Sequence, residues 1–169
     1  VTGSQHLIET DSARILLDCG LFQGRELETR PKNELFRCHP QTLDAVVLSH
    51  AHIDHCGNLP GLVKAGYKRP IFATHATADI ASIMMRDSAR IQEEDAQYER
   101  RNRFRNSSLE PKPLYTEDDA RKAATLFEPV NFHEWADIAD GVRIRFHHAG
   151  HVLGAAITEL ELEDQGEVH

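Results

Sequence analysis

The sequence predicts an α/β domain with mixed β-sheets flanked by helices. The chain opens with two short apolar runs, residues 5–10 and 13–18, joined by the turn residues Asp11 and Ser12, which is the pattern of a β-hairpin. Further runs of strand length follow this hairpin, and segments with helical periodicity separate them. Strands and helices therefore alternate along the chain, and we expect them to pack in layers.

The predicted strands differ in how many faces they bury. Residues 44–49 (DAVVLS) and 69–74 (RPIFAT) are continuous apolar runs, which are typical of strands covered on both faces. In residues 142–148 (VRIRFHH) apolar and polar residues alternate, so we expect this strand to bury one face only. Residues 155–163 (AAITELELE) alternate in the same way.

Three helices are expected between the strands. A short helix covers residues 58–64 and is closed by Gly66. A long helix runs from Thr77 to about Arg105, and its apolar residues recur at spacings of four and seven: Ile80, Met84, Ile91 and Tyr98. The third helix begins after Thr116, a suitable N-cap that precedes three acidic residues, and runs to about Phe127.

Length and composition limit the class of protein. The 169 residues suffice for one domain or for part of a larger one, and 40% hydrophobic with 27% charged residues fits a globular chain. No run approaches the roughly 18 apolar residues of a membrane span, so we expect no membrane contact and no secretory leader. The three cysteines form no CxxC pattern, which predicts a cytoplasmic protein without disulfides. A formal charge of −8 argues against nucleic-acid binding over the whole surface but allows a local basic groove.

Histidine is distributed unevenly. Six of the 11 histidines lie in two clusters, within residues 50–55 and 147–151. The first cluster, SHAHIDHCG at residues 49–57, directly follows a predicted buried strand. In an extended chain His50, His52 and Asp54 fall on one side, while His55 starts the next helix. Imidazole and carboxylate groups bind zinc and, less often, iron or manganese, so this segment predicts a metal site at the end of a strand.

The second cluster, HHAGHVLGA at residues 147–155, also follows a predicted strand. His151 comes directly after Gly150, where the backbone can approach a metal closely, so it is a candidate ligand. His147 and His148 are weaker candidates, and His148 is predicted to support a ligand from behind. Asp18, which ends the segment 13–18, is predicted to hydrogen bond a ligand histidine or to fix the metal loop.

These segments resemble the metallo-β-lactamase superfamily, whose hallmark is the string H-x-H-x-D-H. More narrowly, the chain looks like the β-CASP branch of RNA-processing nucleases, which are related to the mRNA 3′-end cleavage factor. The narrower resemblance covers nearly the whole chain through the strings VTGSQHLIE, ILLDCGLFQG, LSHAHIDHCGNLPGLVKAGY, DSARIQEEDA, PLYTEDDA and AGHVLGAA. It implies a partial αββα sandwich over residues 1–169, the N-terminal part of the core. The β-CASP domain and the rest of the core are expected beyond residue 169.

The resemblance also assigns site residues, with Asp18 as the aspartate of the first motif. One zinc would be bound by three histidines: His50, His52 and His151. A second zinc would be bound by a neighbouring pair: Asp54 and His55. The family's bridging aspartate and its further histidine are not matched, because Asp164 comes too early and His169 lacks the surrounding motif.

The implied activity is hydrolysis of RNA phosphodiester bonds by an endonuclease or 5′-exonuclease, which leaves a 3′-hydroxyl and a 5′-phosphate. Two Zn²⁺ ions roughly 3.5–4 Å apart would hold the substrate and activate water, and Asp54 would orient that water and accept its proton. RNA is the expected partner, bound largely by regions outside this chain. The densest basic set here is Arg86, Arg90, Arg100, Arg101, Arg103 and Arg105. Interleaved acidic residues favour a solvated, salt-bridged helix face over an RNA-binding surface.

Two other functions stay open at this point. A hydrolase of the same fold could act on a small ester or thioester, and only the segments QEEDA and PLYTEDDA argue against this, by resemblance. The chain could also be a catalytically incomplete module that binds at most one metal ion well. An open sheet edge would, in addition, favour a homodimer.

Overall fold

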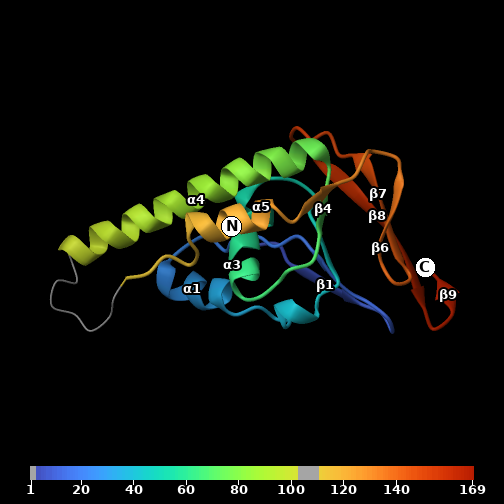
Figure 1. The fold of residues 1–169 in the computed structure, drawn as a ribbon, viewed down its shortest axis with the longest axis horizontal. Coiled ribbons are helices and arrows are strands. Elements are labelled where there is room, and N and C mark those ends of the chain that lie inside the picture. Colours follow the sequence, from blue (N-terminus) through green and yellow to red (C-terminus); the bar gives the residue numbers. More distant parts are fainter. Residues whose placement is uncertain (1–2, 103–110) are drawn as a thin grey trace.

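The computed structural model describes residues 3–102 and 111–169. Figure 1 shows a layered molecule, with helices on one side, one β-sheet in the middle and a second sheet on the other side. The expected α/β class is therefore confirmed. In the described residues no helix is long and apolar enough to cross a membrane. Cys19, Cys38 and Cys56 are free thiols.

The middle layer, sheet A, has the strand order β1-β2-β3-β4-β5. Its strands are β1 (His6–Glu9), β2 (Arg14–Leu17), β3 (Ala45–Val47), β4 (Ile71–Ala73) and β5 (Phe127–Pro129). β1 and β2 form the predicted antiparallel hairpin, with Glu9 opposite Arg14, and the remaining pairs are parallel. The carboxyl ends of β2, β3 and β4 consequently meet at one edge of the sheet.

The outer layer, sheet B, is antiparallel in the order β6-β7-β8-β9. Its strands are β6 (Trp135–Ala139), β7 (Val142–His148), β8 (Ala156–Asp164) and β9 (Glu167–Val168). β7 and β8 confirm the two predicted alternating strands. The short strands β5, β6 and β9 were not predicted from the sequence.

Helices form the layer on the other face of sheet A. They are α1 (Glu26–Glu34), α2 (Ile53–Cys56), α3 (Leu59–Lys64), α4 (His75–Asn102) and α5 (Glu117–Ala124), with a 3₁₀ turn at Pro40–Thr42. α3 ends before Gly66, which has a φ of +109°, as expected for a closing glycine. α4 begins two residues earlier than predicted, and its predicted end at about Arg105 lies outside the described residues.

α5 confirms the predicted cap. The Thr116 side chain accepts a hydrogen bond from the Asp119 backbone N–H, and the Asp119 side chain accepts one from the Thr116 backbone N–H. The helix ends at Ala124 rather than near Phe127, because Phe127 already begins β5.

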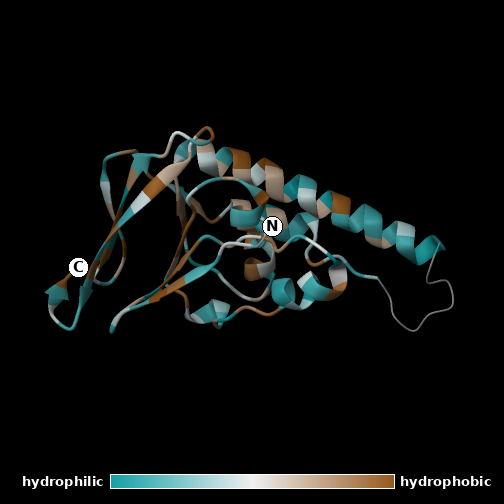
Figure 2. Ribbon diagram, turned by 180° about the vertical axis from the view of Figure 1, so that it is seen from behind, coloured by the Kyte–Doolittle hydropathy of each residue, from teal (hydrophilic) through white to brown (hydrophobic). Residues whose placement is uncertain are grey.

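The central strands of sheet A, β2, β3 and β4, are buried on both faces. Leu16, Val46 and Ile71 belong to the core shared with the helices. Their neighbours on the same strands belong to the core shared with sheet B: Ile15, Val47 and Phe72. Successive side chains of a strand point to opposite faces, so the continuous apolar runs fill both cores. Figure 2 shows hydrophobic colour concentrated in these central strands.

Of the four apolar residues whose spacing predicted α4, only Ile80 packs against the core. Met84, Ile91 and Tyr98 are 38%, 45% and 66% exposed. The buried residues of the helix are Thr77, Ala78, Ala81, Met85, Ala89 and Ala96. Their mostly small side chains let the helix approach the core closely. In Figure 2, hydrophobic and hydrophilic colours accordingly alternate along this helix.

Two neighbouring methionines of α4 test this orientation. Met85→Ala is expected to lower the free energy of unfolding by about 2–5 kcal/mol, because Met85 is fully buried and its loss leaves a cavity. Met84→Ala removes the same side chain from an exposed position and should cost less than about 1 kcal/mol. Urea denaturation of both variants measures the difference, and equal losses would contradict the orientation of the helix.

Candidate metal centre

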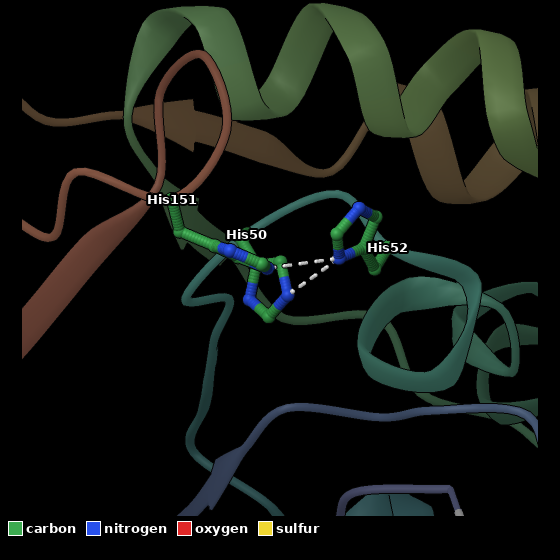
Figure 3. A group of neighbouring side chains, drawn as sticks. All are labelled: His50, His52 and His151. Atoms are coloured by element: carbon green, nitrogen blue, oxygen red, sulfur yellow. Dashed lines mark hydrogen bonds between the residues drawn. The ribbon is translucent and has the colours of Figure 1, made fainter. Parts of the chain in front are cut away.

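Three histidines converge at the carboxyl edge of sheet A. His50 follows β3, His52 precedes α2, and His151 lies in the loop after β7 (Figure 3). His52 Nδ1 lies 3.2 Å from His50 Nε2 and 3.2 Å from His151 Nε2. Within the described part of the chain, this is the group of three ligand-type side chains whose ligand atoms all lie within 4.8 Å of one another.

These distances fit nitrogen ligands around one cation. Zinc–nitrogen bonds of about 2.0–2.1 Å in a tetrahedral site place the nitrogens about 3.3 Å apart. A ring nitrogen offers either one proton or one lone pair, so hydrogen bonding does not satisfy both contacts to His52 Nδ1. The chemistry of the donor set therefore fits a metal ion, and the cluster could hold one.

The two sheets bring His151 to this point. The loop 149–155 is closed by a hydrogen bond from Ala149 N to Ala155 O of 3.2 Å. The next residue on β8, Ala156, donates its N–H to Ser49 O at 2.9 Å, beside His50. Thr74 Oγ1, at the end of β4, donates to Gly154 O at 2.7 Å. Contacts from both β3 and β4 thus fix the His151 loop.

Asp18 occupies the turn after β2 in the left-handed region, with a φ of +59°. Its side chain is buried and accepts three hydrogen bonds: Ser49 N at 2.8 Å, Ser49 Oγ at 2.9 Å and His55 Nδ1 at 2.7 Å. Asp18 thus contacts one of the predicted ligand histidines and holds the loop after β3. Ser49 was not among the predicted site residues, although its place between a strand and the first histidine was a signal.

Asp54 and His55 form a neighbouring pair on α2. His55 Nε2 lies 3.9 Å from Asp54 Oδ2, and the ring of His55 lies 4.0 Å from that of His50, centroid to centroid. The strand-like alternation expected for His50, His52 and Asp54 ends at His52, because the chain turns into a helix at Ile53. Asp54 therefore lies with His55 rather than in the three-histidine group.

Backbone hydrogen bonds hold α2 against the segment that contains Asp18. Asp54 O accepts the N–H of Ser4 at 2.7 Å, and His55 O accepts the N–H of Cys19 at 2.7 Å. Through these two contacts, the segments around Ser4 and Cys19 support the backbone of Asp54 and His55.

Burial and neighbouring groups shift the pKa values of His50 and His55 in opposite directions. Burial, followed by the charge of His55, lowers the pKa of His50 to about 4. His50 is therefore neutral at neutral pH, the form of imidazole that binds metals. The hydrogen bond to Asp18 raises the pKa of His55. This bond also fixes the orientation of the His55 ring.

The other predicted histidines make different contacts. His148 stacks on Phe132 with ring centroids 3.8 Å apart, and its ring lies 5.4 Å from that of His133. His147 Nε2 lies 2.7 Å from Glu159 Oε2 on β8. The supporting role assigned to His148 stays a prediction.

One arginine of the predicted basic set on α4 is paired with acidic residues of the same helix. Arg90 forms ion pairs with Asp87 at 2.7 Å and with Glu94 at 2.9 Å. These contacts agree with the interpretation of a salt-bridged helix face. Arg86, Arg100 and Arg101 are exposed on the same helix, whereas the predicted Arg103 and Arg105 lie outside the described residues.

Comparison with known proteins agrees with this architecture. The chain is 34% identical over 163 residues to the ribonuclease TTHA0252 of Thermus thermophilus. This match covers 96% of the chain and 33% of that protein. It is 36% identical over 158 residues to the cleavage and polyadenylation specificity factor 73 of Drosophila melanogaster, covering 92% of this chain and 21% of that protein. The chain thus spans a third or less of the length of these relatives.

The fold matches solved structures as well. The Rm3 metallo-beta-lactamase superposes with a TM-score of 0.52 at 19% identity, over 96% of this chain and 51% of that one. Residues 7–167 match the family description of the metallo-beta-lactamase superfamily domain. The layered sheets, the histidine cluster at their edge and this match together establish that the chain belongs to the metallo-β-lactamase superfamily.

Proposed function

We propose that the chain carries the metal-binding core of a zinc-dependent ribonuclease of the β-CASP type. The observation that carries the proposal is the convergence of three imidazole nitrogens beside the Asp54–His55 pair. The names of the relatives, a ribonuclease and a cleavage factor for polyadenylation, favour RNA over a small ester as the substrate.

The first Zn²⁺ would be held by His50, His52 and His151. Three nitrogen ligands with an open fourth position are the pattern of catalytic zinc sites, and nitrogen donors favour zinc over magnesium or calcium. The second Zn²⁺ would be held by Asp54 and His55. We infer that the remaining ligands of the second Zn²⁺, and the β-CASP domain, correspond to the part of the relatives that this chain does not match.

Bound zinc would polarise the phosphodiester and lower the pKa of a coordinated water toward neutrality. Asp54 orients the attacking water and accepts its proton. The water oxygen forms the new bond to phosphorus as the bond to the 3′ oxygen breaks. The leaving 3′ oxygen takes up a proton from solvent, so the products are a 3′-hydroxyl and a 5′-phosphate. Asp18 contributes indirectly, because its hydrogen bond holds the ring of His55 next to Asp54.

RNA cleavage by the whole protein tests this function. Cleavage of a 5′-labelled RNA is expected to stop on chelation, to return with Zn²⁺, and to fall about 10²–10⁴-fold in Asp54→Asn, because general acid–base groups contribute that much. Glu94→Gln, an exposed change on α4, should leave the rate unchanged. Cleavage that survives both chelation and Asp54→Asn would contradict the proposal. Hydrolysis of an ester or thioester without RNA cleavage would favour the small-substrate alternative.

A further inference from the structure

The hydroxyl of Ser49 lies between Asp18 and His50. Ser49 Oγ is 2.9 Å from Asp18 Oδ2 and 3.0 Å from His50 Nδ1. The Ser49 backbone N–H donates to the other carboxylate oxygen of Asp18 at 2.8 Å, and Ser49 O accepts the N–H of Ala156 at 2.9 Å. Hydrogen bonds at both its N–H and its C=O thus hold the backbone of Ser49, and this fixes the position of the Ser49 hydroxyl.

These contacts determine where the protons lie. A carboxylate only accepts hydrogen bonds, and a serine hydroxyl has one proton to donate. Ser49 must therefore donate to Asp18, and its oxygen is left to accept a hydrogen bond from His50 Nδ1. A neutral imidazole that carries its proton on Nδ1 has a lone pair on Nε2. His50 Nε2 is the nitrogen that lies 3.2 Å from His52 Nδ1 in the three-histidine cluster.

The same carboxylate acts directly on His55. His55 Nδ1 donates to Asp18 Oδ2 at 2.7 Å, so the proton stays on Nδ1 and Nε2 lies on the side of Asp54. Asp18 therefore sets the ring proton of two histidines, one through direct contact and one through Ser49. These two histidines belong to the two different metal positions of the proposed site.

We propose that Ser49 is a positioning residue that keeps the proton of His50 on Nδ1 and so presents the Nε2 lone pair to the metal. The link to zinc rests on the proposed function, whereas the placement of the proton does not. Without the hydroxyl, His50 Nδ1 loses its acceptor. The tautomer with the proton on Nε2 then becomes accessible, and that nitrogen binds no metal until the proton leaves.

Two variants of this chain test the proposal: Ser49→Ala, which removes the hydroxyl, and Ser49→Thr, which keeps it. Long-range ¹H–¹⁵N correlation spectra of the metal-free chain report the tautomer of each histidine. His50 is expected to carry its proton on Nδ1 in the wild type and in Ser49→Thr, and to shift toward Nε2 protonation in Ser49→Ala. His55, which contacts Asp18 directly, should keep its Nδ1 proton in all three chains.

The affinity for Zn²⁺, measured by competition with a chromophoric chelator, gives a second readout. It is expected to fall about 10–100-fold in Ser49→Ala, the usual cost of losing a partner of a ligand histidine, and to stay within about threefold of wild type in Ser49→Thr. The unchanged His55 signals verify that each variant is folded around Asp18.

The outcomes separate this inference from the proposed function. A wild-type His50 with its proton on Nε2, or a tautomer that is the same in Ser49→Ala, would overturn the role of Ser49. The expected tautomers without Zn²⁺ binding in any variant would support that role and reject the zinc site. If Ser49→Ala fails to fold, the tautomer of His50 in the wild type and in Ser49→Thr still decides the question.

Discussion

Replacement of His52 by alanine is expected to lower the affinity of the chain for Zn²⁺ by more than about 100-fold. His52 Nδ1 is the nitrogen that lies 3.2 Å from both of the others, so its loss leaves only two imidazoles to bind the ion. Loss of a partner that only supports a ligand costs about 10–100-fold, and loss of the ligand itself should exceed this. Isothermal titration of the metal-free chain with Zn²⁺ measures the effect.

His39→Ala is the matched control. His39 precedes the 3₁₀ turn that leads into β3, whereas the three-histidine cluster lies after the carboxyl end of that strand. We expect this variant to bind Zn²⁺ like the wild type. Because His52 is exposed, His52→Ala should change the free energy of unfolding of the metal-free chain by less than about 0.5 kcal/mol. Wild-type affinity in His52→Ala would remove the three-histidine cluster as the metal site.

Gly20→Ala is expected to lower the free energy of unfolding by about 4 kcal/mol or more. A Cβ at this position would lie 1.6 Å from Asp54 O, 2.2 Å from Asp54 C and 2.7 Å from Ser4 N. All three atoms are backbone, so no side-chain rotation relieves the clash, and the segment must move away from α2. Overpacking usually costs about 1–3 kcal/mol, and contacts this short place Gly20 at the upper end or beyond.

Gly166→Ala is the control for Gly20→Ala. Gly166 has a φ of +77°, and a Cβ there meets no atom within 4 Å. Its loss should cost only about 1–2 kcal/mol, from the left-handed backbone. Guanidinium denaturation compares the two variants in the metal-free state. Equal stability would show that the segment after Asp18 does not pack on α2 as closely as described, and the support of Asp54 and His55 would need another explanation.

The sequence by itself predicted the features that depend on short-range periodicity. The hairpin, the buried strands β3 and β4, and the alternating strands β7 and β8 follow from the order of apolar and polar residues. The cap at Thr116 was predicted because its partners lie within three residues. The predicted metal ligands of residues 50–55 are also local, since H-x-H-x-D-H places four ligand-type side chains in six positions. The short strands β5 and β9 carry too few residues for a periodic signal, and Pro31 inside α1 argues against a helix.

Only the tertiary structure decided which distant residues meet. His151 reaches His52 across 99 positions of sequence, because β8 is hydrogen bonded to the loop after β3. Ser49 gains its place because Asp18, 31 positions earlier, lies directly after the neighbouring strand β2. α4 buries four alanines and Met85, whereas Met84, Ile91 and Tyr98 of the predicted apolar spacing are exposed. Periodicity predicts the secondary structure of a segment, because it depends only on residues near one another in the sequence. Which face of a helix or strand is buried, and against which element, depends on how closely the layers can pack in the folded molecule.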